Sequence, residues 1–275
     1  MEYITLGKTG VKISRIGLGA WQFGGDAWGP YEYNVAKSVI AKAVELGINF
    51  IDTAAVYGRG RSEEFVGRAI RELGIREQVF VATKIPGDWH RFDDVLKAAR
   101  RSRERLGLDV IDLLQLHWPA CWHNVPICET MRAMERLVDD GVIRFFGLSN
   151  FDVNGIEEAR SCLSKYDVAA VENRYSLLHR VDESSVIPYV QRNGMLYLAY
   201  TPIEKGAFSN NEFLMGIGKK YGKTAIQVVL NWYVGIDNLV PIPKAGRVEH
   251  VRENAGAMGW RLSRDDWELI SNHFH

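Results

Sequence analysis

Short apolar segments alternate along this chain with segments of helical spacing. The apolar segments are rich in β-branched residues, which favours strands, and the segments between them carry apolar residues three and four positions apart, which favours helices. Eight strands are predicted in this way, and they begin near Ile16, Ile48, Val79, Val110, Ile143, Val168, Met195 and Leu239. Such alternation is typical of βα units and of a parallel sheet covered on both faces.

Capping and stop signals define the helices between these strands. Asn34 and Ser62 are candidate N-caps, and a glycine follows the end of each apolar stripe. The predicted boundaries are Asn34–Gly47, Ser62–Gly74, Asp93–Gly107, and a fourth helix that ends at Gly141. Ahead of the first unit, Tyr3–Thr5 and Val11–Ile13 flank the sequence Gly-Lys-Thr-Gly, which predicts a β-hairpin.

The number of strands defines the fold class. Eight parallel βα units close into a (β/α)8 barrel, the TIM barrel of the α/β class. No Ser-, Gly- or Pro-rich linker divides the chain, so residues 1–275 are predicted to form a single domain. A Rossmann fold is disfavoured, because the candidate fingerprint Gly17–Gln22 lacks the third glycine of G-x-G-x-x-G. A dinucleotide that binds here must therefore bind by another route.

Composition narrows the class of protein further. The chain is 47% hydrophobic and 25% charged, as globular domains are, and its 34 basic residues balance its 34 acidic ones. Zero formal charge argues against a nucleic-acid partner, and no stretch reaches the roughly 18 apolar residues that span a bilayer. With charge in Met1–Lys8 where a signal peptide is apolar, we expect a cytoplasmic protein. Three cysteines (Cys121, Cys128 and Cys162) cannot all pair, which favours a reducing compartment.

Four polar side chains follow or end consecutive strands. Asp52, Lys84 and His117 lie at the carboxyl ends of the second, third and fourth predicted strands, and Tyr57 lies just beyond the second. Barrel enzymes carry their catalytic residues at these ends, so the four side chains are predicted to meet there. Each residue alone is more typical of a buried ion pair or a core histidine; as a set they indicate catalysis.

The chemistry of this set is acid catalysis. A phenol with a pKa of about 10 is a weak donor near neutrality, and a nearby cation lowers that value. Lys84 supplies the cation and Asp52 holds it charged and oriented, while His117 donates a hydrogen bond to a carbonyl oxygen. Together they would polarise a carbonyl group and protonate it as a hydride arrives.

Several short motifs occur in a fixed order around these residues. They are Gly17–Trp21, Asp52–Gly58 with Ser62-Glu63, Thr83-Lys84, Leu116–Pro119, Gly147–Phe151, and Pro241–Lys244 followed by Glu253-Asn254. In order and spacing the chain resembles the aldo-keto reductase family over essentially its whole length. The resemblance implies a (β/α)8 barrel whose N-terminal hairpin closes the bottom. It also implies an extended nicotinamide cofactor, usually NADPH, with NADH as the alternative, and a catalytic tetrad in which Tyr57 is the acid.

The resemblance also implies how the cofactor would be held. Ser149 and Asn150 match a pair that binds the nicotinamide carboxamide, and Tyr200 matches the aromatic residue that stacks on the ring. Further matches are Thr201, Ile203 and Lys205 near the pyrophosphate, and Lys244, Arg247, Glu253 and Asn254 near the adenosine. A helix that starts after the last strand is itself a natural phosphate site.

Three positions depart from the family pattern. Glu172 stands where a glutamine usually contacts the carboxamide, and a carboxylate can accept but not donate there. Its alternative partners in the sequence are Arg174 and Arg180. Ala245 and His250 replace a common serine and arginine, which weakens the case for a clamp on the 2′-phosphate of NADPH.

Tryptophans, a group of Cys and His residues and a run of arginines are further candidate features. Trp21 and Trp118 are predicted to form an aromatic wall of the substrate pocket, with Trp89 and Trp122 as further pocket residues. Cys121, His123 and Cys128 do not match a zinc spacing, so no metal is expected. A run of arginines is interpreted as a solvated helix face and comprises Arg100, Arg101, Arg103 and Arg105.

Two function classes remain open at this point. The first is an enzyme that reduces aldehydes or ketones reversibly with a nicotinamide cofactor; its particular carbonyl substrate and its oligomeric state are not defined by the sequence. The second is a cofactor-binding regulatory subunit, like the potassium-channel subunits that resemble this family. The chain has no extra N-terminal segment before its predicted hairpin, which disfavours the second class.

Overall fold

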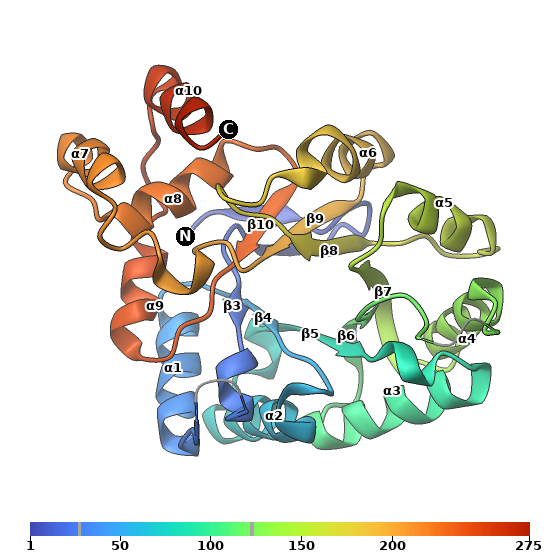
Figure 1. Cartoon of the computed structure of the whole chain (residues 1–275). Helices are drawn as coiled ribbons and strands as arrows, with labels where there is room; N and C mark the ends of the chain where they lie inside the picture. The colour runs from blue at the N-terminus through green and yellow to red at the C-terminus, as the bar shows by residue number, and fades with distance from the viewer. Residues whose placement is uncertain (27–28, 122–123) are drawn as a thin grey trace.

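Eight parallel strands form the centre of the molecule, and helices surround them (Figure 1). The computed structural model describes residues 1–26, 29–121 and 124–275. The sheet strands are β3 (Leu18–Gly19), β4 (Phe50–Asp52), β5 (Phe80–Ile85), β6 (Ile111–Leu116), β7 (Ile143–Ser149), β8 (Ala170–Arg174), β9 (Leu196–Tyr200) and β10 (Leu239–Ile242). Each strand pairs with the next in chain order, as the strand–helix alternation predicts.

The first and last strands meet and close the barrel. The amide groups of Gly17 and Gly19 donate to the carbonyl oxygens of Pro241 and Pro243, at 2.9 and 3.1 Å. A parallel bridge between Gly19 and Lys244 lies beside these bonds. The (β/α)8 barrel predicted from the sequence is therefore confirmed.

The helices form the outer layer. They are α1 (Tyr33–Glu45), α2 (Arg61–Leu73), α3 (Phe92–Leu106), α4 (Ile127–Asp139), α5 (Val153–Ser161), α6 (Val186–Asn193), α7 (Glu212–Tyr221), α8 (Ala225–Val234), α9 (Val248–Ala255) and α10 (Arg264–His273). Gly74 and Gly107 end α2 and α3 in the left-handed conformation, as predicted. Asn34 is not an N-cap, because α1 already begins at Tyr33, whose ring packs against Phe65 at 5.4 Å.

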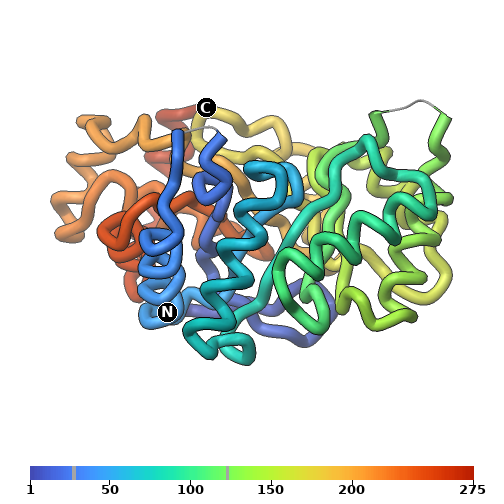
Figure 2. Tube along the Cα trace, turned by 90° about the horizontal axis from the view of Figure 1, so that it is seen from below, coloured from blue at the N-terminus to red at the C-terminus, as the bar shows by residue number. Residues whose placement is uncertain are grey.

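The N-terminal hairpin closes one end of the barrel. It consists of β1 (Tyr3–Thr5) and β2 (Lys12–Ser14), and it lies at the lower edge of the view in Figure 2. Leu6 and Ile13 are fully buried and pack with apolar residues that fill the barrel interior, among them Phe50 and Phe80. A second and larger core lies between the strands and the helices. The barrel interior is thus closed at the end that the hairpin covers.

One member of the predicted solvated arginine face is instead an internal ion-pair partner. Arg105 on α3 pairs with Glu63 on α2 at 2.6 Å, and Glu63 is fully buried. The hydroxyl of Thr83 donates to the other oxygen of the same carboxylate, at 2.6 Å. The run of arginines on α3 did not reveal this contact, because Glu63 lies on a helix in a different βα unit.

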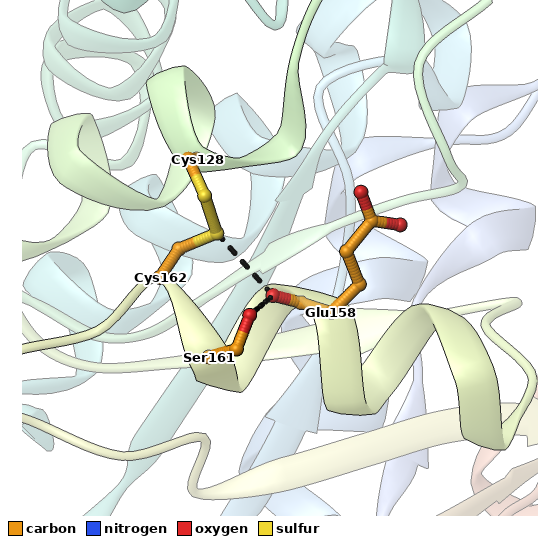
Figure 3. Close-up of a disulfide and its surroundings, with 4 residues drawn as sticks. All are labelled: Cys128, Glu158, Ser161 and Cys162. Carbon is orange, nitrogen blue, oxygen red and sulfur yellow. Dashed lines mark hydrogen bonds between the residues drawn. A yellow bond between two sulfur atoms is a disulfide. The ribbon is translucent and has the colours of Figure 1, made fainter.

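Two of the cysteines are joined, contrary to the expectation of reduced thiols. Cys128 in α4 and Cys162 at the end of α5 form a disulfide (Figure 3). Cys121 is free and exposed. The Sγ atom of Cys162 lies 3.3 Å from the carbonyl oxygen of Glu158, which also accepts from the hydroxyl of Ser161 at 2.7 Å. Because Cys128 is paired, it is not available as a metal ligand, and His123 lies outside the described residues.

Candidate active site

Polar side chains occupy the inner positions of the barrel strands at the end opposite the hairpin. Side chains two positions apart share a face of a strand. Phe50, Ala82, Leu113, Ala170 and Leu198 fill the interior. The residues two positions further on are Asp52, Lys84, Gln115, Glu172 and Tyr200. These five side chains therefore face inward just above the apolar filling, at the carboxyl ends of β4, β5, β6, β8 and β9.

A cavity of about 450 Å³ opens at this end of the barrel. Many of the predicted site residues line it. They are Trp21, Asp52, Tyr57, His117, Trp118, Ser149, Asn150, Glu172, Tyr200, Thr201, Ile203, Lys205 and Lys244. Lys84 is fully buried beside Asp52, so the structure brings all four residues of the predicted tetrad together.

Lys84 is the centre of a buried charge cluster. Its Nζ atom donates to Asp52 Oδ1 at 2.7 Å and to the carbonyl oxygen of Thr53 at 3.1 Å. It also lies 3.2 Å from Glu172 Oε1, and the amide nitrogen of Gln115 donates to Glu172 Oε2 at 2.6 Å. The two carboxylates raise the pKa of Lys84 against the opposing effect of burial, so Lys84 stays charged.

Glu172 therefore has partners that the sequence did not suggest. Arg174 pairs with Glu204 and Arg180 with Glu183, so neither of the alternative arginines reaches Glu172. Gln115 was also overlooked, although an amide in the mainly apolar strand β6 was a visible signal. Both residues lie inside the barrel, where most buried polar groups are hydrogen-bonded.

Tyr57 is held at the rim of the cavity by a close backbone contact. It begins a short 3-10 turn, η2 (Tyr57–Gly60), that packs on the turn η1 (Trp21–Gly24). A Cβ atom on Gly58 would lie 2.2 Å from the carbonyl oxygen of Gly24, and the φ angle of Gly58 is +60°. Only glycine fits there. The amide group of Gly58 also donates to Asp26, a cavity residue that sequence analysis missed.

The acidity of Tyr57 differs from the expected direction. Burial raises the pKa of the phenol above its usual value, and Asp52 and Glu172 add to this effect, while Lys84 opposes it. The expectation of a lowered pKa is thus wrong, because desolvation outweighs the cation. Tyr57 is consequently protonated at neutral pH. Lys84 Nζ lies 5.5 Å from the centre of its ring.

His117 is neutral in these surroundings. Burial, followed by the charge of Lys84, lowers its pKa to about 3. Its ring stands edge-on to that of Tyr57, with centroids 5.8 Å apart. Its Nδ1 atom is buried and has no hydrogen-bond partner among the described residues. A neutral imidazole donates from one nitrogen only, so His117 can offer a hydrogen bond without carrying charge.

Three hydrogen-bonded side chains line the cavity next to His117. The amide nitrogen of Asn150 donates to the carbonyl oxygen of His117 at 2.7 Å, and the hydroxyl of Tyr200 donates to Asn150 Oδ1 at 2.8 Å. Ser149 Oγ accepts from the same amide nitrogen at 3.1 Å. These contacts fix Ser149, Asn150 and Tyr200 side by side next to the tetrad.

Basic residues lie where the last strand leads into α9. Lys244 lines the cavity and is half-buried, which lowers its pKa. Arg247 precedes the helix and donates to His250 Nε2 at 3.3 Å. Glu253 accepts a hydrogen bond from Thr224, and Asn254 is buried. Arg247, Glu253 and Asn254 do not line the cavity itself.

Two of the four tryptophans predicted for the substrate pocket line the cavity. Trp21 and Trp118 line the cavity, and the ring of Trp21 stacks near that of Tyr57 with centroids 6.0 Å apart. Trp89 does not line it and is 40% exposed. Trp122 lies outside the described residues.

The described residues include neither a membrane-spanning helix nor a group of metal ligands. Residues 1–26, 29–121 and 124–275 contain no helix that is both long and apolar enough to cross a membrane. Over the same ranges, no three His, Cys, Asp or Glu side chains are grouped as metal ligands would be.

A (β/α)8 barrel with polar side chains at the carboxyl ends of its strands is typical of barrel enzymes. Comparison with known proteins identifies the family. Residues 15–274 match the model of the Aldo/keto reductase family. The chain is 33% identical to the aldo-keto reductase YhdN of Bacillus subtilis over 98% of its own length and 93% of that protein. It is 32% identical to the glyoxal reductase of the same organism, over 95% and 89% of the two chains.

Solved structures agree with this assignment. An aldo/keto reductase from Klebsiella pneumoniae in complex with NADP and acetate matches with a TM-score of 0.90 and 28% identity, over 100% of this chain and 96% of that one. This chain therefore belongs to the aldo/keto reductase family, and the resemblance noted in its sequence is confirmed.

Proposed function

We propose that this protein reduces aldehydes or ketones to alcohols with NADPH, and that the reaction is reversible. The observation that carries the proposal is the convergence of Asp52, Tyr57 and His117 at one cavity of a family barrel, with Lys84 buried against Asp52. The NADP-bound relative from Klebsiella pneumoniae supports the choice of cofactor. We further propose that residues 1–275 act as one domain.

The residues along the cavity fit an extended nicotinamide cofactor. Ser149 and Asn150 offer a hydroxyl and an amide next to the tetrad, and Tyr200 offers an aromatic face there. Lys205 and Lys244 supply positive charge further along, and Arg247 lies at the start of α9, where helix polarity favours phosphate. Thr201, Ile203, Glu253 and Asn254 complete the proposed binding residues.

The protein's own groups then act on a carbonyl oxygen. A reduced nicotinamide, when bound, supplies the hydride. Tyr57 is protonated and donates its phenolic proton to the oxygen, while neutral His117 orients and polarises it with a hydrogen bond. Lys84 remains charged and stabilises the phenolate that Tyr57 becomes, and Asp52 holds Lys84 in place. In alcohol oxidation the same proton moves in the opposite direction.

The aromatic side of the cavity suggests small carbonyl compounds. Trp21 and Trp118 present flat apolar surfaces beside Tyr57 and His117, with ring centroids of His117 and Trp118 4.4 Å apart. Because a relative is a glyoxal reductase, we propose glyoxal and related small aldehydes as the first substrates to test.

The test is cofactor consumption in the presence of a carbonyl panel. Purified protein is mixed with NADPH or NADH and with glyoxal, methylglyoxal or an aromatic aldehyde, and the loss of reduced cofactor is followed. We expect turnover with at least one aldehyde and a preference for NADPH. Tight binding of NADPH without turnover across the panel would contradict the proposal and favour the regulatory class. Protein without added carbonyl compound is the control for background oxidation.

A further inference from the structure

Two carboxylates share Lys84 in the barrel interior. Lys84 Nζ lies 2.7 Å from Asp52 Oδ1 and 3.2 Å from Glu172 Oε1, and it is fully buried. Asp52 and Glu172 border the cavity but are only 4% and 1% exposed, so water screens their charges weakly. With both carboxylates ionised, the cluster would carry one net negative charge.

Among the residues that the structure describes, the groups in contact with the cluster do not neutralise that charge. Gln115, which donates to Glu172 Oε2, is uncharged, and His117 is neutral. The titratable groups that face the cluster from the neighbouring elements are Tyr57 from η2, His117 from the end of β6 and Tyr200 from β9. None of these supplies a second cation. A buried net charge is expensive, and two carboxylates at one site lower the cost by retaining a proton.

We propose that Asp52 and Glu172 together hold one proton beside Lys84. The cluster is then neutral, with one ammonium and one carboxylate, and Glu172 is a positioning residue of the acid machinery rather than a cofactor contact. The kinetic part of this inference rests on the function proposed above.

The electrostatics of Asp52 agree with the geometry. Burial raises the pKa of its carboxyl group, and the Glu172 carboxylate raises it further through charge and hydrogen bonding, while Lys84 lowers it. Desolvation outweighs the ion pair, and the direction of this shift favours retention of a proton.

The retained proton can replace the one that Tyr57 gives away. After the O–H bond of Tyr57 breaks, an N–H bond of Lys84 breaks and a new phenolic O–H bond forms. The carboxyl O–H bond then breaks and the Lys84 N–H bond is restored. One proton moves from the carboxyl pair to Tyr57, no electrons are transferred, and the pair recovers its proton from solvent.

Infrared spectroscopy of the protein without cofactor tests the shared proton directly. A protonated carboxyl group absorbs as a C=O stretch apart from ionised carboxylates, and it shifts in deuterated water. We expect this band in the wild-type protein near pH 7, and we expect it to disappear as the pH is raised. A wild-type protein without the band between pH 6 and 8 would overturn the proposal, and this measurement needs no variant.

Substitutions assign the band to the pair. Glu172→Gln leaves one carboxylate for one ammonium, so the band is expected to vanish, while Glu172→Asp restores it. Glu63→Gln removes another fully buried carboxyl group, paired with Arg105, and must leave the band unchanged. Persistence of the band in a folded Glu172→Gln variant would show that the proton does not belong to the pair.

The pH profile of carbonyl reduction tests the kinetic consequence. Above the pH at which the pair loses its proton, the cluster becomes negative, the phenolate is disfavoured and kcat falls. In Glu172→Gln this basic limb is expected to move upward by about one pH unit or more, and Glu172→Asp is expected to retain it. An unchanged limb would refute this electrostatic role of the pair. If no carbonyl compound is reduced at all, the proposed function fails, while the infrared band still decides the shared proton.

Discussion

Replacement of Lys84 by methionine removes the cation that contacts both Asp52 and Glu172. Methionine keeps much of the side-chain volume, so the change is mainly electrostatic. Lys84 has no exposed surface, and its Nζ atom lies 2.7 Å from Asp52 and 3.2 Å from Glu172. Loss of one partner of a buried ion pair typically costs about 3–5 kcal/mol of unfolding free energy. We expect a loss in this range near neutral pH.

This loss should depend on pH in a defined direction. Without the cation, burial and the neighbouring carboxylate keep the pKa of Asp52 above its unfolded value, so the folded variant binds more protons than the unfolded chain. Stability is then present at low pH and is lost as the pH rises. If the wild-type pair holds one proton and the variant holds two, the difference between them grows by about 1.4 kcal/mol per pH unit.

Urea denaturation at pH 6 and pH 8, followed by tryptophan fluorescence, measures both quantities. Lys165→Met is a suitable control, because Lys165 pairs with Asp139 at the surface and should leave stability close to that of the wild type. A Lys84→Met variant that is equally destabilised at both pH values would refute the argument, since its carboxyl groups would then bind no extra proton.

Three further predictions concern the site. Tyr57→Phe should lower carbonyl reduction by about 10²–10⁴-fold and leave NADPH affinity nearly unchanged, while the surface variant Tyr166→Phe should match the wild type; turnover by Tyr57→Phe at the wild-type rate would exclude Tyr57 as the acid. Lys244→Ala and Arg247→Ala should each weaken NADPH more than NADH, by about 1.5–3 kcal/mol, in fluorescence titrations; equal losses would show that neither side chain contacts the 2′-phosphate. His117, with its pKa lowered to about 3, should show no protonation step between pH 5 and 8 in NMR titrations, and a midpoint near the ordinary value of about 6.5 would contradict the burial argument.

The sequence predicted the barrel well because its signals are local and repeated. Each βα unit carries its own apolar period and its own glycine stop, so an error in one unit does not disturb the others. Asn34 shows the limit of such signals, since packing of Tyr33 on Phe65 moves the helix start ahead of the cap residue. The ends of the strands also place Asp52 and Lys84 correctly, because side-chain direction alternates strictly along a strand.

Side-chain contacts between βα units that are far apart in the chain could not be predicted from the sequence. Glu172 lines the cavity as expected, but its contacts with Lys84 and Gln115, which lie on β5 and β6, were not predicted. Cys128 and Cys162 are 34 positions apart and meet only because α4 packs beside α5. The pKa of Tyr57 was predicted in the wrong direction, because a sequence lists the nearby cation but not the depth of burial.

Transfer of a labelled hydride tests the central claim most directly. The protein is incubated with NADPH that carries deuterium on the transferable position of the nicotinamide, together with an aldehyde that supports turnover, and the alcohol is analysed by mass spectrometry. The account predicts one deuterium on the carbinol carbon of each product molecule and a far slower appearance of that product with Tyr57→Phe. An alcohol without deuterium, or equal rates for the two proteins, would contradict it.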